Sequence, residues 1–322
     1  MLLHSFSILV GLVVLVWSAD RFISGAAALA DNLGVSPMLI GLTVVGFGTS
    51  APEVLVSIMA AVNGNPGLAI GNAIGSNIAN IGLILGFTAL VIPLSVHSSV
   101  LKREYPLLLA VTVICILLML DGELGRFDGG VLLVLLVAVF GWMIYTAKTG
   151  AADPIAGEYD AEIPHNVPTK KALLLLIGGL IFLLISSRLL VWGATHVAIA
   201  LGVSDVVIGL TIVAIGTSLP ELAASITSAM KKEDDIAIGN VIGSNLYNML
   251  AVLSIPGLVA PGPFSPAVLT RDLPVMFGLT LFLFFMGYGF GKQGRINRFE
   301  GLGLLLCFVG YQSWLFYALI TH

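Results

Sequence analysis

One stretch of this chain is written twice at a fixed distance. Residues 41–86 read GLTVVGFGTSAPEVLVSIMAAVNGNPGLAIGNAIGSNIANIGLILG, and residues 209–254 read GLTIVAIGTSLPELAASITSAMKKEDDIAIGNVIGSNLYNMLAVLS. The offset is 168 residues without a gap, and 22 of the 46 aligned positions are identical. The register continues outward, where residues 33–36 match residues 201–204. A duplication of this length predicts that one structural unit occurs twice in the fold.

The composition places both units in a lipid bilayer. Of the 322 residues 58% are hydrophobic and 10% are charged, a composition that excludes a soluble globular domain. A helix needs about 20 apolar residues to cross the hydrocarbon core. Ten stretches near that length are found, five in each half of the chain. They are residues 6–30, 37–62, 68–93, 104–121, 127–147, 172–200, 206–230, 236–260, 272–290 and 299–320.

The odd number of spans in each half decides how the two halves are related. After five spans the chain has changed sides, so the second half enters the membrane from the opposite face. We therefore expect an all-α membrane protein with ten transmembrane helices in two inverted five-helix repeats. Residues 1–149 and 170–322 form these repeats, and residues 150–169, with three prolines and four acids, form a linker too short to fold alone. Inverted repeats are typical of secondary transporters, whose substrates bind near the midplane.

The distribution of basic residues predicts the orientation. Cytoplasmic connections of membrane proteins are enriched in Lys and Arg. Ten basic residues lie on or beside connections 3/4, 5/6, 7/8 and 9/10, and two lie on the opposite set. We therefore expect a cytoplasmic linker and both termini outside. The ten are Lys102, Arg103, Lys148, Lys170, Lys171, Lys231, Lys232, Lys292, Arg295 and Arg298; the two are Arg126 and Arg271.

Spans 2 and 7 each contain a glutamate in an otherwise apolar segment, within the strings GTSAPE (48–53) and GTSLPE (216–221). An ionised side chain near the bilayer centre costs about 2.5 to 3.5 kcal/mol on insertion scales, so it requires a partner or a wet cavity. Glu53 and Glu221 occupy matching positions of the two repeats. We therefore expect both to face inward and to bind cations.

The prolines next to these glutamates predict broken helices. Pro52 and Pro220 lack the amide donor and clash with the carbonyl four residues earlier. Ser50 and Ser218 precede the glutamates by three residues, which is the spacing of a capping box. We expect each serine to cap a new helix, and carbonyls at 46–49 and 214–217 to become oxygen ligands.

Spans 3 and 8 carry polar stripes in the strings GNAIGSNIAN (71–80) and GNVIGSNLYN (239–248). Positions four residues apart share one helical face. Such residues either bind ions or hold membrane helices together. We leave both roles open for the first asparagine of each stripe and favour ion binding for the deepest one, while Asn77 and Asn245 lie one residue off the stripes. The stripes are Asn72, Ser76 and Asn80, and Asn240, Ser244 and Asn248.

The donor atoms in these four motifs are all oxygens. Neither His nor Cys occurs in the motifs, and Cys115 and Cys307 lie far apart in apolar runs. Oxygen ligands select hard cations, meaning calcium, sodium or magnesium, over zinc or copper. Two carboxylates balance one Ca²⁺, and an empty pair would take up a proton because like charges repel. The predicted site therefore favours the exchange of one cation for another.

The paired GTSxPE and GNxIGSN motifs resemble the two alpha-repeats of the calcium/cation antiporter superfamily, and specifically a prokaryotic sodium/calcium exchanger. The resemblance implies a core of spans 2, 3, 7 and 8, with spans 1 and 6 sliding as a gate, in a multi-pass protein of the inner membrane. It also implies the metal-binding residues. These are Thr49, Ser50, Glu53, Ser76 and Asn80, their counterparts Thr217, Ser218, Glu221, Ser244 and Asn248, and the carbonyls of Gly46 and Ala214.

Some members of the superfamily have an aspartate where this chain has Asn248 or Asn80. Because a third carboxylate is linked in the family to potassium co-transport, we do not expect potassium dependence. The expected function is exchange of Ca²⁺ for Na⁺ by alternating access. Proton-driven calcium exchange by the same glutamates is the alternative, and a cation channel is less favoured. We expect neither enzymatic activity nor a cofactor, and no nucleic acid or obligate protein partner.

Overall fold

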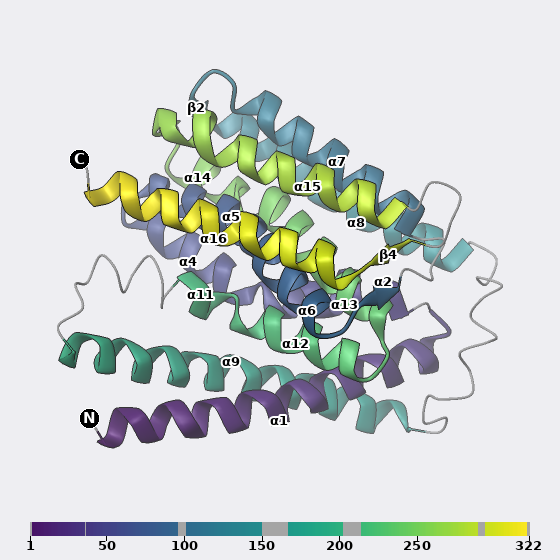
Figure 1. Cartoon of the computed structure of the whole chain (residues 1–322). Helices are drawn as coiled ribbons and strands as arrows, with labels where there is room; N and C mark the ends of the chain where they lie inside the picture. The colour runs from purple at the N-terminus through teal and green to yellow at the C-terminus, as the bar shows by residue number, and fades with distance from the viewer. Residues whose placement is uncertain are drawn as a thin grey trace.

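The chain folds into a bundle of helices, and the computed structural model describes residues 2–35, 37–95, 101–149, 167–201, 214–288 and 294–320 (Figure 1). The α-helices are α1 (Leu2–Leu33), α2 (Pro37–Ile40), α3 (Gly46–Thr49), α4 (Ala51–Val62), α5 (Pro66–Ala79), α6 (Gly86–Val91), α7 (Leu101–Leu118), α8 (Arg126–Thr149), α9 (Thr169–Ala200), α11 (Ala214–Thr217), α12 (Leu219–Met230), α13 (Asp234–Tyr247), α14 (Ser254–Val259), α15 (Leu273–Tyr288) and α16 (Arg298–Ile320). Four π-helical segments are η1 (Gly41–Val45), η2 (Asn80–Leu85), η4 (Asn248–Val252) and η5 (Val268–Asp272).

These elements account for the ten predicted spans. Among the described residues, seven helical segments are long and apolar enough to cross a membrane, and an eighth span is bent by 49° between η1–α3 and α4. The shorter apolar helix α7 is the fourth span. The seventh consists of α11 and α12, and its predicted first part, residues 206–213, lies outside the described residues. Most of the predicted linker, residues 150–166, lies outside them as well.

Two short antiparallel ladders reveal the inversion of the repeats. Strand β1 (Leu94–Ser95) pairs with β4 (Arg295–Ile296), and β2 (Glu123–Leu124) pairs with β3 (Gly262–Pro263). The connection between the third and fourth spans therefore meets the connection between the ninth and tenth. The repeat counterpart of the connection between the third and fourth spans is the connection between the eighth and ninth, which pairs through β3 with the connection after the fourth span. The fourth span separates the two places, so equivalent connections lie on opposite faces of the bundle.

Helices α1 and α9 run side by side along one edge of the molecule (Figure 1). They are antiparallel, because a Cβ atom on Gly11 would meet Leu190 and one on Gly25 would meet the backbone of Leu176. Glycines allow the two backbones to approach closely, as is common between membrane helices. Helix α1 begins and helix α16 ends at one end of the bundle, which we call the termini face (Figure 1). The opposite face is where α8 ends and α9 begins.

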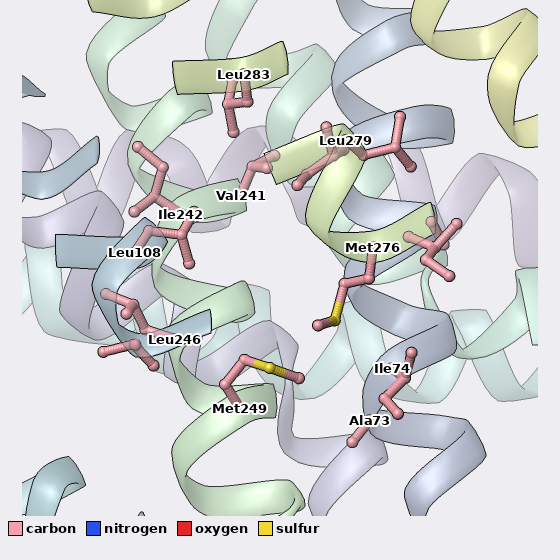
Figure 2. Close-up of a cluster of buried hydrophobic side chains, with 14 of the residues drawn as sticks. Ala73, Ile74, Leu108, Val241, Ile242, Leu246, Met249, Met276, Leu279 and Leu283 are labelled. Carbon is pink, nitrogen blue, oxygen red and sulfur yellow. The ribbon is translucent and has the colours of Figure 1, made fainter. Parts of the chain in front are cut away.

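The central packing unit joins the two halves. Side chains of α5, α7, α13, η4 and α15 interdigitate around Ile74, Ile242, Met249 and Met276, each at most 1% exposed (Figure 2). Helix α13 is buried along nearly its whole length, whereas α5 buries the face of Ser76 and Asn80 and leaves Leu68 and Gly71 exposed. This burial positions the polar stripes at the middle of the molecule.

The last spans of the two halves align with each other at a different offset from the rest of the repeat. The string RFDG at residues 126–129 matches RFEG at residues 298–301, an offset of 172 residues instead of 168. The match is structural, since Asp128 accepts a hydrogen bond from the backbone N–H of Gly125 at 2.8 Å and Glu300 accepts one from that of Asn297 at 2.7 Å. The second half therefore has four additional residues before α16. In this register Gln312 of α16 corresponds to Phe140 of α8.

Helix α13 packs against the broken second span at backbone contact. A Cβ atom on Gly243 of α13 would collide with the carbonyl oxygen of Leu42 in η1. In contrast, Gly141 of α8 is exposed, and no heavy atom of the described residues lies within 4 Å of a Cβ atom built there. The residues that match η1 in the second half lie outside the described residues.

This difference predicts unequal effects of the same substitution. Gly243→Ala should lower the free energy of unfolding by about 2 kcal/mol, because the added methyl overpacks the crossing, and should lower the Tm in detergent by about 5 °C. Gly141→Ala is the control at an uncrowded helical glycine and should leave Tm within about 2 °C of the wild type. Thermal unfolding followed by tryptophan fluorescence measures both, and equal shifts would contradict the close packing at Gly243.

Candidate functional site

Two glutamates meet at the junction of the repeats. Glu53 lies in the first turn of α4 and Glu221 in the first turn of α12, and each is 1% exposed. Their carboxylates are close enough to interact electrostatically. Within the described part of the chain, neither forms an ion pair with a basic residue. A buried carboxylate pair without a basic partner requires a bound cation or a proton.

The predicted breaks are present, but the predicted capping boxes are wrong. Ser50 and Ser218 stand between the two helical parts of their spans with ψ near 5° and 4°, and neither side chain caps the following helix. Instead, Ser50 Oγ donates to Glu221 Oε1 across the repeat junction at 3.3 Å. Ser218 Oγ is buried and has no hydrogen-bond partner among the described residues. Ser50 thus faces a carboxylate of the other repeat and not the end of its own helix.

Hydroxyl groups close one side of this junction. Thr49 Oγ1 lies 3.1 Å from Asn240 Oδ1 and 3.5 Å from Ser244 Oγ, so α3 is bonded to α13. Ser244 Oγ also lies 3.4 Å from the carbonyl oxygen of Gly46. That carbonyl accepts the backbone N–H of Ser50 at 3.1 Å. The carbonyl of Gly46 is therefore hydrogen-bonded in this structure, and Ala214 begins α11 at the equivalent place.

The first asparagine of each stripe anchors a glutamate backbone. Asn72 Nδ2 donates to the carbonyl oxygen of Glu53 at 3.0 Å, and Asn240 Nδ2 donates to that of Glu221 at 3.2 Å. Asn240 Nδ2 also lies 2.9 Å from Ser225 Oγ. Of the two roles left open by the sequence, the structure shows helix-to-helix bonding for both residues.

The deepest asparagines present buried amide atoms to the junction. Asn80 and Asn248 are each 1% exposed and begin the π-helical segments η2 and η4. Asn80 Nδ2 donates to Asn245 Oδ1 at 3.0 Å, while Asn80 Oδ1 has no partner within the described part of the chain. Both amide atoms of Asn248 lack one too. Buried polar atoms are normally hydrogen-bonded, so these orphans indicate a place for a ligand.

Sequence reasoning missed two features of this region. Asn245 lies one residue off the polar stripe, yet it orients Asn80. The π-helical turns at Asn80 and Asn248 rotate the following residues and are common at functional sites. The repetition of asparagine at positions 77, 80, 245 and 248 is the sequence signal that could have indicated such a network.

A pocket of about 90 Å³ lies on the other side of the junction. It is lined by side chains of α5, the broken seventh span and α16. Its polar wall contains Ser76, Thr217 and Ser218, which are predicted site residues, and Asn72. This volume accommodates water molecules or a partly hydrated ion. The pocket is nearer the termini face, because α16 approaches its C-terminal end there.

The pocket and the closed contacts are repeat counterparts of each other. Thr49, Ser244 and Asn240 bond together on one side, and the matching Thr217, Ser76 and Asn72 line the pocket on the other. The aromatic rings show the same difference between the two halves. Tyr247 lies 4.2 Å from Phe140 and 5.3 Å from Phe47 between ring centroids on the closed side, while the matching Ala79, Gln312 and Ile215 line the pocket.

An ion pair links helix α1, which runs beside α9, to helix α12 of the core. Lys231 Nζ, at the end of α12, lies 2.7 Å from Asp20 Oδ1 of α1. Asp20 lies within the predicted first span, residues 6–30. Helix α1 is thus attached to the core by a contact between partly exposed charges, whose strength is modest.

Comparison with known proteins places the chain in a family. A family described as "Sodium/calcium exchanger protein" matches residues 4–145 and 171–317. The candidate antiporter CaxA of Alkalimonas amylolytica is 50% identical, and the alignment covers 98% of this chain and 99% of the relative. The sodium/calcium exchanger MaX1 of Methanosarcina acetivorans is 33% identical, with 96% and 97% covered. The inner membrane protein YrbG of Escherichia coli (strain K12) is 41% identical, with 98% and 96% covered.

Solved structures agree with the sequence relatives. The sodium-calcium exchanger NCX_Mj, soaked with 2.5 mM Na⁺ and 0.1 mM Ca²⁺, superposes with a TM-score of 0.82 at 35% identity, covering 96% of this chain and 97% of that chain. The fold is therefore the predicted arrangement of ten helices in two inverted repeats. The chain belongs to the sodium/calcium exchanger family of the calcium/cation antiporter superfamily, and it is a membrane antiporter of cations and not an enzyme.

Proposed function

We propose that this protein exports Ca²⁺ against entering Na⁺ by alternating access. The observation that carries this proposal is the pair of buried carboxylates, Glu53 and Glu221, contributed by opposite repeats and linked through Ser50. With no basic partner among the described residues, the pair has two charges to neutralise. One Ca²⁺ or two Na⁺ supply that charge, so the two cargoes compete for one site.

The remaining ligands follow from the same geometry. We assign cation binding to the hydroxyl and amide oxygens that surround the carboxylates, because Ca²⁺ takes six to eight oxygen ligands and Na⁺ also prefers oxygen. The orphaned amides of Asn80 and Asn248 and the orphaned hydroxyl of Ser218 support this assignment. The proposed set is Glu53, Glu221, Thr49, Thr217, Ser50, Ser218, Ser76, Ser244, Asn80 and Asn248, with the carbonyls of Gly46 and Ala214.

The asymmetry of the halves supports alternating access. In the observed arrangement Ser76, Thr217 and Ser218 of the proposed site line the pocket near the termini face, while Thr49 bonds to Asn240 and the ring of Tyr247 stacks on Phe140 in the other half. Because the repeats are inverted, exchange of their two arrangements would open the opposite face and close this one. A continuous channel would have both pathways open together.

The membrane orientation belongs to the same proposal. We assign both termini to the outside of the inner membrane and the 150–169 linker, between repeats 1–149 and 170–322, to the cytoplasm. Arg295 and Lys231 lie on connections of the opposite face, in keeping with the excess of basic residues there. The pocket then faces the outside, where Na⁺ enters and Ca²⁺ leaves.

Substitution of the carboxylates tests the site. Glu53→Gln and Glu221→Gln should each reduce sodium-dependent ⁴⁵Ca²⁺ flux below about 1% of wild type, because the amide keeps the shape and loses a charge that strongly stabilises the bound ion. Size-exclusion profile and Tm should remain those of a folded protein. Glu123→Gln, at an exposed acid of a surface connection, is the matched control and should transport normally. Normal flux in both buried variants would refute the site.

The driving ion can be identified in reconstituted vesicles. Vesicles loaded with Na⁺ and diluted into sodium-free buffer should take up ⁴⁵Ca²⁺ at least about tenfold above vesicles without a gradient, because Na⁺ leaving the site is replaced by Ca²⁺. A protonophore should leave this uptake unchanged. Uptake driven by a pH gradient without sodium would instead establish the proton-coupled alternative.

Fusion reporters test the orientation. Alkaline phosphatase joined after His322 should be active in a bacterial host, because it folds outside the cytoplasm, and a fluorescent protein at the same place should be dark. The same two reporters inserted in the 150–169 linker should give the reverse result, because five spans separate the two positions. Identical results at the two positions would require an even number of spans between them and would contradict this topology.

A further inference from the structure

The pocket near the termini face contains one polar residue outside the repeated motifs. Gln312 of α16 lines this pocket together with Asn72, Ser76, Thr217 and Ser218. Its side chain is half-buried and forms no hydrogen bond with any residue that the structure describes. The amide is therefore available to whatever occupies the pocket.

Gln312 stands where the polar pocket meets an apolar groove. A second cavity, of about 380 Å³, is lined by Gln312, Phe308 and Ile215 of the pocket and by Ser313, Val309 and two further side chains of α16. The lining of this groove is mostly apolar, with Gln312 and Ser313 as its polar side chains among the described residues. Asn72 Nδ2 is committed to the carbonyl of Glu53, so its Oδ1 is the group left to face the pocket. Two amide oxygens, from α5 and α16, are thus available in one small pocket.

The repeat counterpart of this pocket has no such group among the described residues. Phe140 takes the place of Gln312, and its ring stacks on Tyr247 at 4.2 Å between centroids with an interplanar angle of 23°. This difference is chemical and not conformational, because it is a difference of sequence. When the opposite face opens, its pathway is lined by aromatic rings, so the termini face is the one that offers a polar residue of the last span.

We propose that Gln312, with Asn72, forms a loading site for a partly hydrated Ca²⁺ or Na⁺ between the termini face and the buried carboxylates. The amide oxygens replace some water ligands of the cation before it reaches Ser76, Thr217 and the glutamates. Neutral oxygens suit this role, since they favour a cation without trapping it. This inference rests on the proposed function, and it makes Gln312 a determinant of apparent affinity at one face only.

The test is a measurement of KM at each face. Gln312→Leu keeps the side-chain volume and removes the oxygen, and should raise the KM for Ca²⁺ at the termini face about fivefold, the effect of one lost polar contact. The KM at the opposite face should change less than about twofold, and the maximal rate should be retained. Right-side-out and inside-out membrane vesicles provide the two faces, with sodium-dependent ⁴⁵Ca²⁺ flux as the readout.

Two further variants separate loading from packing. Gln312→Glu retains an oxygen at the same place and should return the KM to the wild-type value or below it. Ser313→Ala, at the exposed neighbour that lines only the groove and bonds to Val309, should behave as wild type at both faces. An equal rise of KM at both faces in Gln312→Leu, or failure of Gln312→Glu to restore it, would assign Gln312 a structural role and overturn the inference.

The same experiment distinguishes failure of the inference from failure of the function. If wild-type vesicles exchange Ca²⁺ and Glu53→Gln vesicles do not, an unchanged KM in Gln312→Leu refutes only the loading site. If wild-type vesicles carry no cation flux, the proposed function and the loading site are both wrong.

Discussion

Two negative charges buried without a basic partner among the described residues are the constraint on which the rest of this structure depends. Glu53 and Glu221 are each 1% exposed inside a bundle whose surface faces hydrocarbon. A charge in such surroundings is tolerated only with compensation. Each break places a glutamate in the first turn of a helix, and the first break also places Ser50 beside the carboxylate of Glu221. A cation bound between the carboxylates, as proposed, would supply the remaining compensation.

A duplicated sequence does not require a symmetric molecule. Thr49 lies within hydrogen-bond distance of Asn240 and Ser244, and the repeat counterparts Thr217, Asn72 and Ser76 line a pocket. Identical residues thus stand in two different surroundings, as the proposed alternation between two states requires. The aromatic contacts of Tyr247 differ between the halves because of the sequence itself, since its repeat counterpart Ala79 has no ring. The two pathways therefore differ permanently in chemistry.

The spans, their inversion and the breaks were predictable because they follow from hydropathy, parity and the chemistry of proline. Prediction failed where the outcome depended on a partner from the other repeat. Ser50 has the spacing of a capping residue, yet a carboxylate 171 positions away offers its hydroxyl a better acceptor. The π-helical turns at Asn80 and Asn248 and the register shift before α16 were also missed. A single alignment offset of 168 concealed the correspondence of Gln312 with Phe140.

In the proposed site, the amides at positions 80 and 248 decide how much negative charge is present. An amide oxygen can bind a cation as a carboxylate oxygen does, but it adds no charge and takes up no proton near neutral pH. With both positions as amides, the negative charge of the site is confined to two carboxylates. One Ca²⁺ or two Na⁺ neutralise these, and any further cation leaves the loaded site positive inside a low-dielectric bundle, at a cost that grows as water is excluded. Charge balance therefore favours exchange of one divalent ion for monovalent ions over simultaneous binding of both.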